Sequence, residues 1–132
     1  MGVYFIKIAS VFLLFGIVLG IYMGIAEDFK YGDLHAHINL VGWVTTGIYG
    51  LVYSFFPKIG SNKLAKTHFW LHIIGTPLLL GSIFLITINK MEAGMALGIP
   101  GALIVLLAVI IFGVNLFKNL NPTVHQNISA KV

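Results

Sequence analysis

Two pairs of histidines are the residues of this chain with the clearest capacity for chemistry. His35 and His37 lie two positions apart in "GDLHAHINLVGWVTTG", and His68 and His72 lie four apart in "THFWLHIIG". Both stretches are apolar enough to enter a membrane, where a neutral imidazole must bond something and commonly marks a cofactor or a functional path. Because the chain has no cysteine, thiolate metal sites, cysteine nucleophiles and disulfides are excluded.

The spacing of the first pair predicts two separate partners. On an α-helix, residues two apart point roughly 200° away from each other, so one metal ion cannot readily bind both His35 and His37. The alternative for His35 is a place at the membrane surface, where its ring contacts water or lipid head groups. His37 lies about half a turn deeper, so it is the stronger candidate for a cofactor ligand.

The spacing of the second pair places both rings on one face of a helix. One interpretation is that His68 and His72 form a metal or haem site of their own, separate from any site at His35 and His37. The alternative places both rings at the membrane interface beside Trp70, bonded to backbone, lipid phosphate or water. We favour this alternative because that helix has no carboxylate to complete a metal site. The fifth histidine, His125, lies in the polar tail and is expected to be solvated.

The elements that carry these histidines are expected to be membrane-spanning helices. The chain has 132 residues, is 58% hydrophobic and 9% charged, and has a mean hydropathy of +0.98, which is too much apolar surface for a small soluble domain to bury. We predict an all-α integral membrane protein, with a single four-transmembrane-helix bundle at 1–117 and a polar cytoplasmic tail at 118–132. The four helices are expected at about 3–26, 34–56, 67–88 and 94–117.

The lysines predict the orientation of these helices. If the spans alternate, six of the eight lysines lie on the side of the N-terminus, the second link and the tail, whereas Lys30 and Lys90 lie on the other side with all four acids. The positive-inside rule then puts both termini in the cytoplasm, in a membrane of the bacterial inner (plasma) type. We expect the first span to be retained, because its apolar run is longer than a signal-peptide core. The scattered lysines do not indicate nucleic-acid binding.

Glycines recur every four residues on the first and last helices, which lets helix backbones approach closely in lipid. This pattern fits packing within one subunit and an oligomer interface equally well. The glycines concerned are Gly16, Gly20, Gly24, Gly94 and Gly98.

The stretch "HAHINLVGW" resembles the catalytic subunit of the haem-copper oxidase superfamily, which includes cytochrome oxidases and nitric oxide reductases. In that family a His-x-His on one helix ligates two different haems, and a His-x-Asn-Leu start in the nitric oxide reductase branch is matched by His37, Asn39 and Leu40. "HFWLHIIG" resembles part of the next helix. The resemblance implies haem b, with iron ligated by His37 and His35, and Asn39 and Trp43 as further cofactor contacts.

The resemblance covers about residues 3–117, which correspond to one of the three four-helix arcs of the enzymes. The chain lacks the copper-binding His-Pro-Glu-Val stretch, so copper is not expected, and neither is full oxygen reduction by a monomer. Whether the protein is an enzyme stays open. A five-coordinate haem could act as an oxidoreductase centre for quinol, oxygen or nitric oxide.

One chain does not offer two axial ligands to one haem. His37 lies near the start of its helix and His72 near the start of the next, antiparallel one, so their depths differ by roughly 15 Å. A homo-oligomer is therefore expected. A trimer, in which His37 of one copy faces His35 of the next, is narrowly favoured over a twofold dimer in which two His37 rings share one haem.

Two functions remain open from the sequence. The first is a haem b protein that performs electron transfer, or redox or gas chemistry, at the outer half of the membrane, with quinol as one candidate donor. The alternative is a haem-free structural or assembly subunit of a respiratory complex. Only the first would show the absorption bands of haem.

Overall fold

The computed structural model describes residues 1–120, and all regular elements among them are helices. In chain order they are α1 (Gly2–Ala26), α2 (Gly32–His37), η1 (Ile38–Thr45), α3 (Thr46–Phe55), α4 (Pro57–Gly60), α5 (Lys63–Thr87) and α6 (Met91–Asn119). The elements α2, η1 and α3 follow one another without a break and form one long helix.

Within residues 1–120, four helices are long and apolar enough to cross a membrane. They are Gly2–Ala26, Gly32–Phe55, Lys63–Thr87 and Met91–Asn119. The prediction of an all-α protein with four candidate spans is confirmed, and the expected bounds differ from the observed ones by at most four residues. The short helix α4, which lies in the second link, was not predicted. It begins at Pro57, whose fixed φ suits the first turn of a helix.

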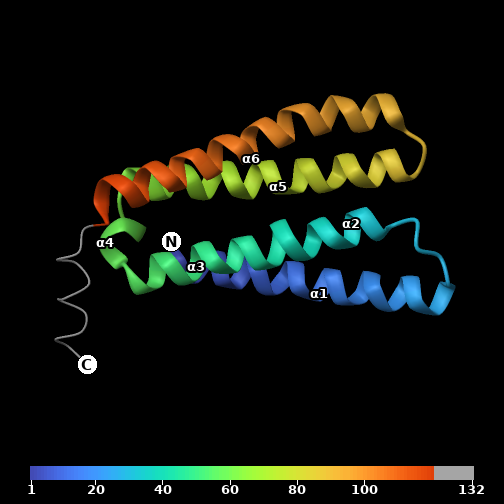
Figure 1. Cartoon of the computed structure of the whole chain (residues 1–132), viewed down its shortest axis with the longest axis horizontal. Helices are drawn as coiled ribbons and strands as arrows, with labels where there is room; N and C mark the ends of the chain where they lie inside the picture. Colours follow the sequence, from blue (N-terminus) through green and yellow to red (C-terminus); the bar gives the residue numbers. More distant parts are fainter. Residues whose placement is uncertain (121–132) are drawn as a thin grey trace.

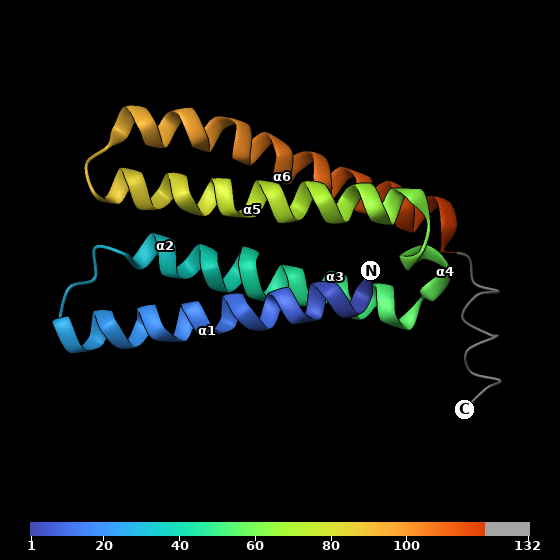
Figure 2. The ribbon, with the colours of Figure 1, turned by 180° about the vertical axis from the view of Figure 1, so that it is seen from behind.

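The four spans form two antiparallel hairpins. α1 packs along the long helix α2–η1–α3, and α5 packs along α6 (Figure 1). The two views show the hairpins side by side, with residues 27–31 and 88–90 at one end, here called the loop end (Figure 2). The start of α1 and the last turn of α6 lie at the opposite end, called the α4 end.

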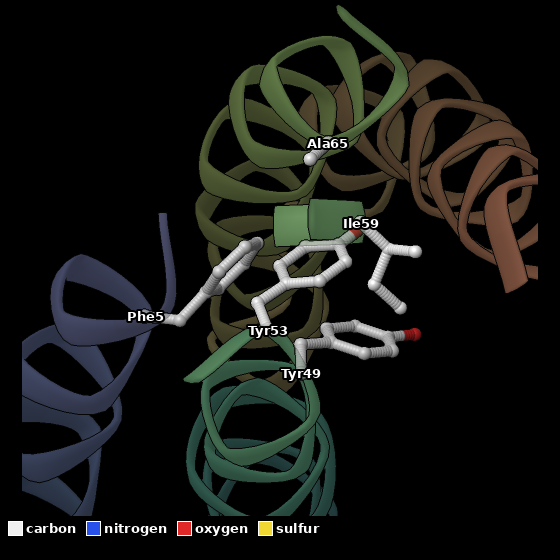
Figure 3. Close-up of a cluster of buried hydrophobic side chains, with 5 residues drawn as sticks. All are labelled: Phe5, Tyr49, Tyr53, Ile59 and Ala65. Atoms are coloured by element: carbon white, nitrogen blue, oxygen red, sulfur yellow. The ribbon is translucent and has the colours of Figure 1, made fainter. Parts of the chain in front are cut away.

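A buried cluster joins the two hairpins at the α4 end. Phe5 of α1, Tyr49 and Tyr53 of α3, Ile59 of α4 and Ala65 of α5 form one buried cluster (Figure 3). The exposed fractions of these side chains are between 0% and 5%. Since the four spans otherwise expose much apolar surface, this cluster is where the chain forms a closed protein core.

The long second span contains a π-helical segment. From Ile38 to Thr45 the backbone bonds follow the i→i+5 pattern of a π-helix instead of the α-helical i→i+4 pattern. The Thr45 and Thr46 hydroxyls donate to the carbonyls of Leu40 and Val41, five residues back, at 2.7 and 3.0 Å. A π turn holds an extra residue, so side chains after Thr45 are rotated relative to those of a continuous α-helix. This rotation separates the His37 turn from the face that carries Thr46.

Four of the five repeated glycines pack within the subunit. A Cβ on Gly16 would lie 2.5 Å from Asn39 Oδ1, and one on Gly20 would lie 3.0 Å from the His35 ring. On α6, side chains at Gly94 and Gly98 would meet α5. Gly24 has nothing within 4 Å. Packing within one subunit therefore explains the glycine rows except at Gly24.

Candidate functional site

His37 lies on the last turn of α2, at the loop end of the bundle, and its side chain is exposed. Its Nδ1 lies 2.8 Å from the carbonyl oxygen of Asp33, one helical turn earlier. A carbonyl can only accept a hydrogen bond, so Nδ1 carries the proton and donates it. The other ring nitrogen, Nε2, then presents a lone pair on an exposed surface, as a metal-ligating histidine does.

His35 has a different environment. Its side chain is half-buried, and its ring lies against α1 at Gly20. The Asn39 amide nitrogen lies 3.3 Å from His35 Nε2 and donates to the His35 carbonyl oxygen at 2.8 Å. Residues two apart on the same helix thus have one ring inside the hairpin and one outside, in agreement with the divergence expected from their spacing.

The four predicted cofactor contacts do not come together on one surface of the chain. His37 and Trp43 are exposed, and the exposed fraction of Trp43 is 39%. His35 and Asn39 instead face α1, where Asn39 lies at Gly16. Leu40, between the two exposed residues, is 62% exposed. The outer surface of this span therefore offers one imidazole and apolar side chains.

The expectation that His68 and His72 bond lipid or water at the membrane interface is wrong. Their exposed fractions are 0% and 1%, and both rings lie inside the bundle at the α4 end. Phe5 stacks on the His68 ring with centroids 5.1 Å apart, and Tyr49 meets both rings edge-on, at 4.4 and 5.1 Å. The helix face that carries the pair turns toward α3 and α1, whereas Trp70, 61% exposed, points away.

Each buried imidazole has a hydroxyl partner on α3. Tyr53 Oη lies 2.9 Å from His68 Nδ1, and Thr46 Oγ1 lies 2.7 Å from His72 Nε2. The Thr76 hydroxyl lies 3.4 Å from the same nitrogen of His72. Among residues 1–120, His68 Nε2 and His72 Nδ1 have no hydrogen-bond partner.

Asn115 of α6 connects Tyr53, the partner of His68, to helix α4 and to the start of α5. Its Nδ2 donates to the Ile59 carbonyl at 3.0 Å, and its Oδ1 accepts from Asn62 at 2.7 Å and from Asn119 at 2.9 Å. Sequence reasoning did not identify Thr46, Thr76 and Asn115 as site residues. The sequence could have indicated them, because each is a polar side chain inside an otherwise apolar span and must find a hydrogen-bond partner there.

The pair does not form a complete metal site by itself. Within the described residues, no group of three or more His, Asp or Glu side chains converges on one point. A structural metal ion such as zinc needs four ligands, so His68 and His72 would supply half of such a set.

An apolar pocket of about 560 Å³ lies between the two hairpins, nearer the loop end. Its wall is formed by α1, η1 and α5, and contains Phe12, Phe15, Leu19, Ile38, Pro77 and Leu80. Tyr22 is the one titratable residue in its lining, and the other lining side chains are apolar.

Comparisons with known proteins provide no relative of this chain. No protein-family model, no curated protein and no solved structure matches it. The expectation for His125 lies outside the described residues.

Proposed function

We propose that this protein is a membrane-bound haem b protein and that His37 is an axial ligand of the haem iron. The proposal is supported most directly by the hydrogen bond from His37 Nδ1 to the Asp33 carbonyl. This bond fixes the ring and leaves the Nε2 lone pair on the exposed side of the helix. Haem needs one or two such nitrogens from the protein, and not the larger shell that a bare metal ion requires.

The neighbouring residues fit a porphyrin beside His37. Leu40, Trp43 and Val44 are exposed by 39% to 62% and provide apolar contacts. Lys30 and Lys90 lie at the loop end and could pair with the haem propionates, although Lys30 already forms an ion pair with Asp28 at 3.0 Å. A bound haem supplies one-electron chemistry at its iron. The chain supplies the ligand, its orientation and an apolar surface.

A homo-oligomer completes this site in the proposal, because within residues 1–120 no second imidazole faces the exposed side of His37. The half-buried position of His35 against Gly20 favours the twofold arrangement, in which His37 from each of two copies binds one haem. In the trimer, His35 would have to leave α1 to reach the neighbouring copy. The position of His35 therefore favours a dimer over the trimer that the resemblance narrowly favoured.

The same proposal includes the orientation of the chain. With three lysines, Lys58, Lys63 and Lys66, in or near the link that contains α4, the positive-inside rule puts the α4 end in the cytoplasm. His37 then lies toward the outer face of a bacterial-type inner membrane. Electron transfer at that outer half, with quinol as a candidate donor, is the activity we assign.

The test is the absorption spectrum of the protein purified in mild detergent, measured together with its native mass. We expect a Soret band, the spectrum of a six-coordinate low-spin haem, and a dimer that carries one haem. A coloured trimer would retain the haem and contradict the twofold arrangement. A colourless protein from haem-supplied cells would contradict the proposal and favour the haem-free structural or assembly subunit.

A further inference from the structure

The buried histidine pair at the α4 end is far from His37, and its hydrogen bonds determine which ring nitrogens carry protons. The starting point is Asn62, whose Oδ1 accepts from the backbone nitrogen of Ala65 at 2.8 Å and caps α5. Its Nδ2 must therefore be the group that donates to Asn115 at 2.7 Å. This fixes Oδ1 of Asn115 as the acceptor and Nδ2 as the donor, in agreement with the bond from Nδ2 to the Ile59 carbonyl.

The orientation of Asn115 in turn fixes the Tyr53 hydroxyl. Asn115 Nδ2 lies 3.5 Å from Tyr53 Oη, so the phenol oxygen faces a donor on that side. The single hydroxyl proton of Tyr53 is then free to be donated to His68 Nδ1 at 2.9 Å. A neutral imidazole has one N–H, so the proton of His68 is on Nε2. Since His68 Nε2 has no partner among residues 1–120, it is a buried donor without an acceptor.

In His72, unlike His68, the nitrogen without a partner is the one that lacks the proton. The Thr46 hydroxyl, at the end of the π-helical segment, lies 3.0 Å from the Val41 carbonyl and 2.7 Å from His72 Nε2. Because the carbonyl can only accept, we assign the hydroxyl proton to it, and the Thr46 oxygen then accepts from His72 Nε2. The proton of His72 is therefore on Nε2, and Nδ1 is bare. His72 Nδ1 is thus a buried acceptor without a donor.

One buried donor and one buried acceptor, on adjacent turns of α5, form a complementary pair. An unpaired buried polar group is destabilising, so two such groups are a strong reason for a bound partner. The ring centroids of His68 and His72 are 6.0 Å apart. Rings at this separation are close enough for one small molecule to hydrogen-bond both of them. Buried waters in proteins typically make about three such bonds.

We infer that His68 and His72 bind one hydroxyl-bearing molecule, a water, which accepts from His68 Nε2 and donates to His72 Nδ1. The bridge completes a hydrogen-bonded chain from Asn115 through Tyr53 and the two imidazoles to Thr46. Phe5 and Tyr49 pack on the rings and close this site to solvent. This site is independent of the haem proposed at His37. It also disfavours a metal ion, because a metal would need a lone pair on the nitrogen of His68 that carries the proton.

Nitrogen-15 NMR of the histidine-labelled protein in lipid nanodiscs tests this inference. The chemical shifts of ring nitrogens distinguish protonated from bare positions, so the unmodified protein already gives a result. We expect both buried rings to be protonated at Nε2, and magnetisation transfer from water to the Nε2 proton of His68. Protonation of His68 at Nδ1 would overturn the inference, and so would absence of that transfer.

Two further outcomes would also overturn it. A scalar coupling between His68 Nε2 and His72 Nδ1 would show that the rings bond each other directly, without a bridge. Binding of added Zn²⁺ that shifts the signals of both rings would show a metal site instead. Neither outcome depends on haem, so the inference can fail while the His37 proposal stands, and the reverse also holds.

Matched variants test the two hydroxyl contacts. Tyr53→Phe removes the donor to His68, and we expect the His68 ring to lose its preference for the Nε2 proton. Tyr4→Phe, at a side chain 60% exposed, is the control and should change nothing. Thr46→Val should shift the His72 Nε2 signal, whereas Thr45→Val, which removes a hydroxyl bonded only to the Leu40 carbonyl, should not. Equal spectra for Thr46→Val and Thr45→Val would refute the assigned role of Thr46.

Discussion

The histidines differ in what their ring nitrogens can still do, and this difference separates a candidate ligand from core residues. His37 donates from Nδ1 to a backbone carbonyl and leaves Nε2 exposed. His68 and His72 instead each bond a hydroxyl and are enclosed by aromatic rings. An exposed lone pair with a fixed orientation suits a large flat cofactor that covers the helix surface. A buried nitrogen between aromatic side chains has room only for a small partner.

At His37 we predict a loss of haem on substitution. His37→Ala removes the proposed iron ligand, so the purified protein should lose its Soret band. His35→Ala should keep the haem, since that ring lies against α1 and serves packing in the twofold arrangement. The measurement is the haem content per chain after purification. Full haem in His37→Ala would refute the ligand assignment, and loss of haem in His35→Ala would favour the trimer.

Asn115 is predicted to be the most important polar residue for stability at the α4 end. It is fully buried and bonds Ile59, Asn62 and Asn119. Asn115→Ala leaves these groups without their partner, and we expect a loss of about 2–3 kcal/mol in the free energy of unfolding. Asn119→Ala removes only one of the bonds and should have a smaller effect. Thermal unfolding in detergent measures both, and equal melting temperatures would contradict the role assigned to Asn115.

At the scale of the helices, close approach and hydrogen bonding take the place of amphipathic packing. Water does not drive apolar faces together in lipid, so helices there associate through small residues and polar contacts. Gly16 and Gly20 let α1 approach Asn39 and His35 of the second span. Within that span, the π segment directs Thr46 toward His72. Contact between helices thus determines the orientation of His35, His68 and His72, whereas His37 is held by a bond within its own helix.

The glycine row of α1 provides a matched pair of substitutions. Gly16→Ala would put a Cβ 2.5 Å from Asn39 Oδ1, so the helices must separate or the amide must move, and we expect a loss of about 1–3 kcal/mol. Gly24→Ala meets nothing within 4 Å and should be neutral or stabilise by up to about 1 kcal/mol through helix propensity. Thermal melts of the two variants distinguish them. A destabilised Gly24→Ala would instead indicate an oligomer contact there.

For the whole molecule, different kinds of contact join the two hairpins at their two ends. The buried cluster and the Asn115 hydrogen bonds join them at the α4 end, whereas at the loop end Tyr31 stacks on Phe84 of α5 with centroids 6.2 Å apart. We therefore expect the hairpins to separate first at the loop end, where His37 lies.

The orientation proposal predicts protection of the C-terminus. A tag placed after Val132 should resist protease added to intact cells, because the positive-inside rule puts that end in the cytoplasm. A tag inserted in the loop at residues 27–31 should be cleaved under the same conditions once the outer membrane is permeabilised. Immunoblots of both tagged proteins report the result. The opposite pattern would reverse the orientation and place His37 on the cytoplasmic side.

The sequence by itself determined the number, approximate bounds and membrane character of the helices. A run of about 20 apolar residues is a local property, and the bilayer thickness converts it directly into a span. The divergence of His35 and His37 was also predictable, because it depends only on their spacing along one helix.

Only the tertiary structure decided which face of each helix points inward. In a membrane, apolar residues are favourable both in the core and against lipid, so the sequence of a span carries little periodic signal for its buried face. The burial of His68 and His72 therefore could not be distinguished from a position at the membrane interface. The bonds of Tyr53, Thr46 and Asn115 join helices far apart in the chain, and these contacts made the second histidine pair part of the core.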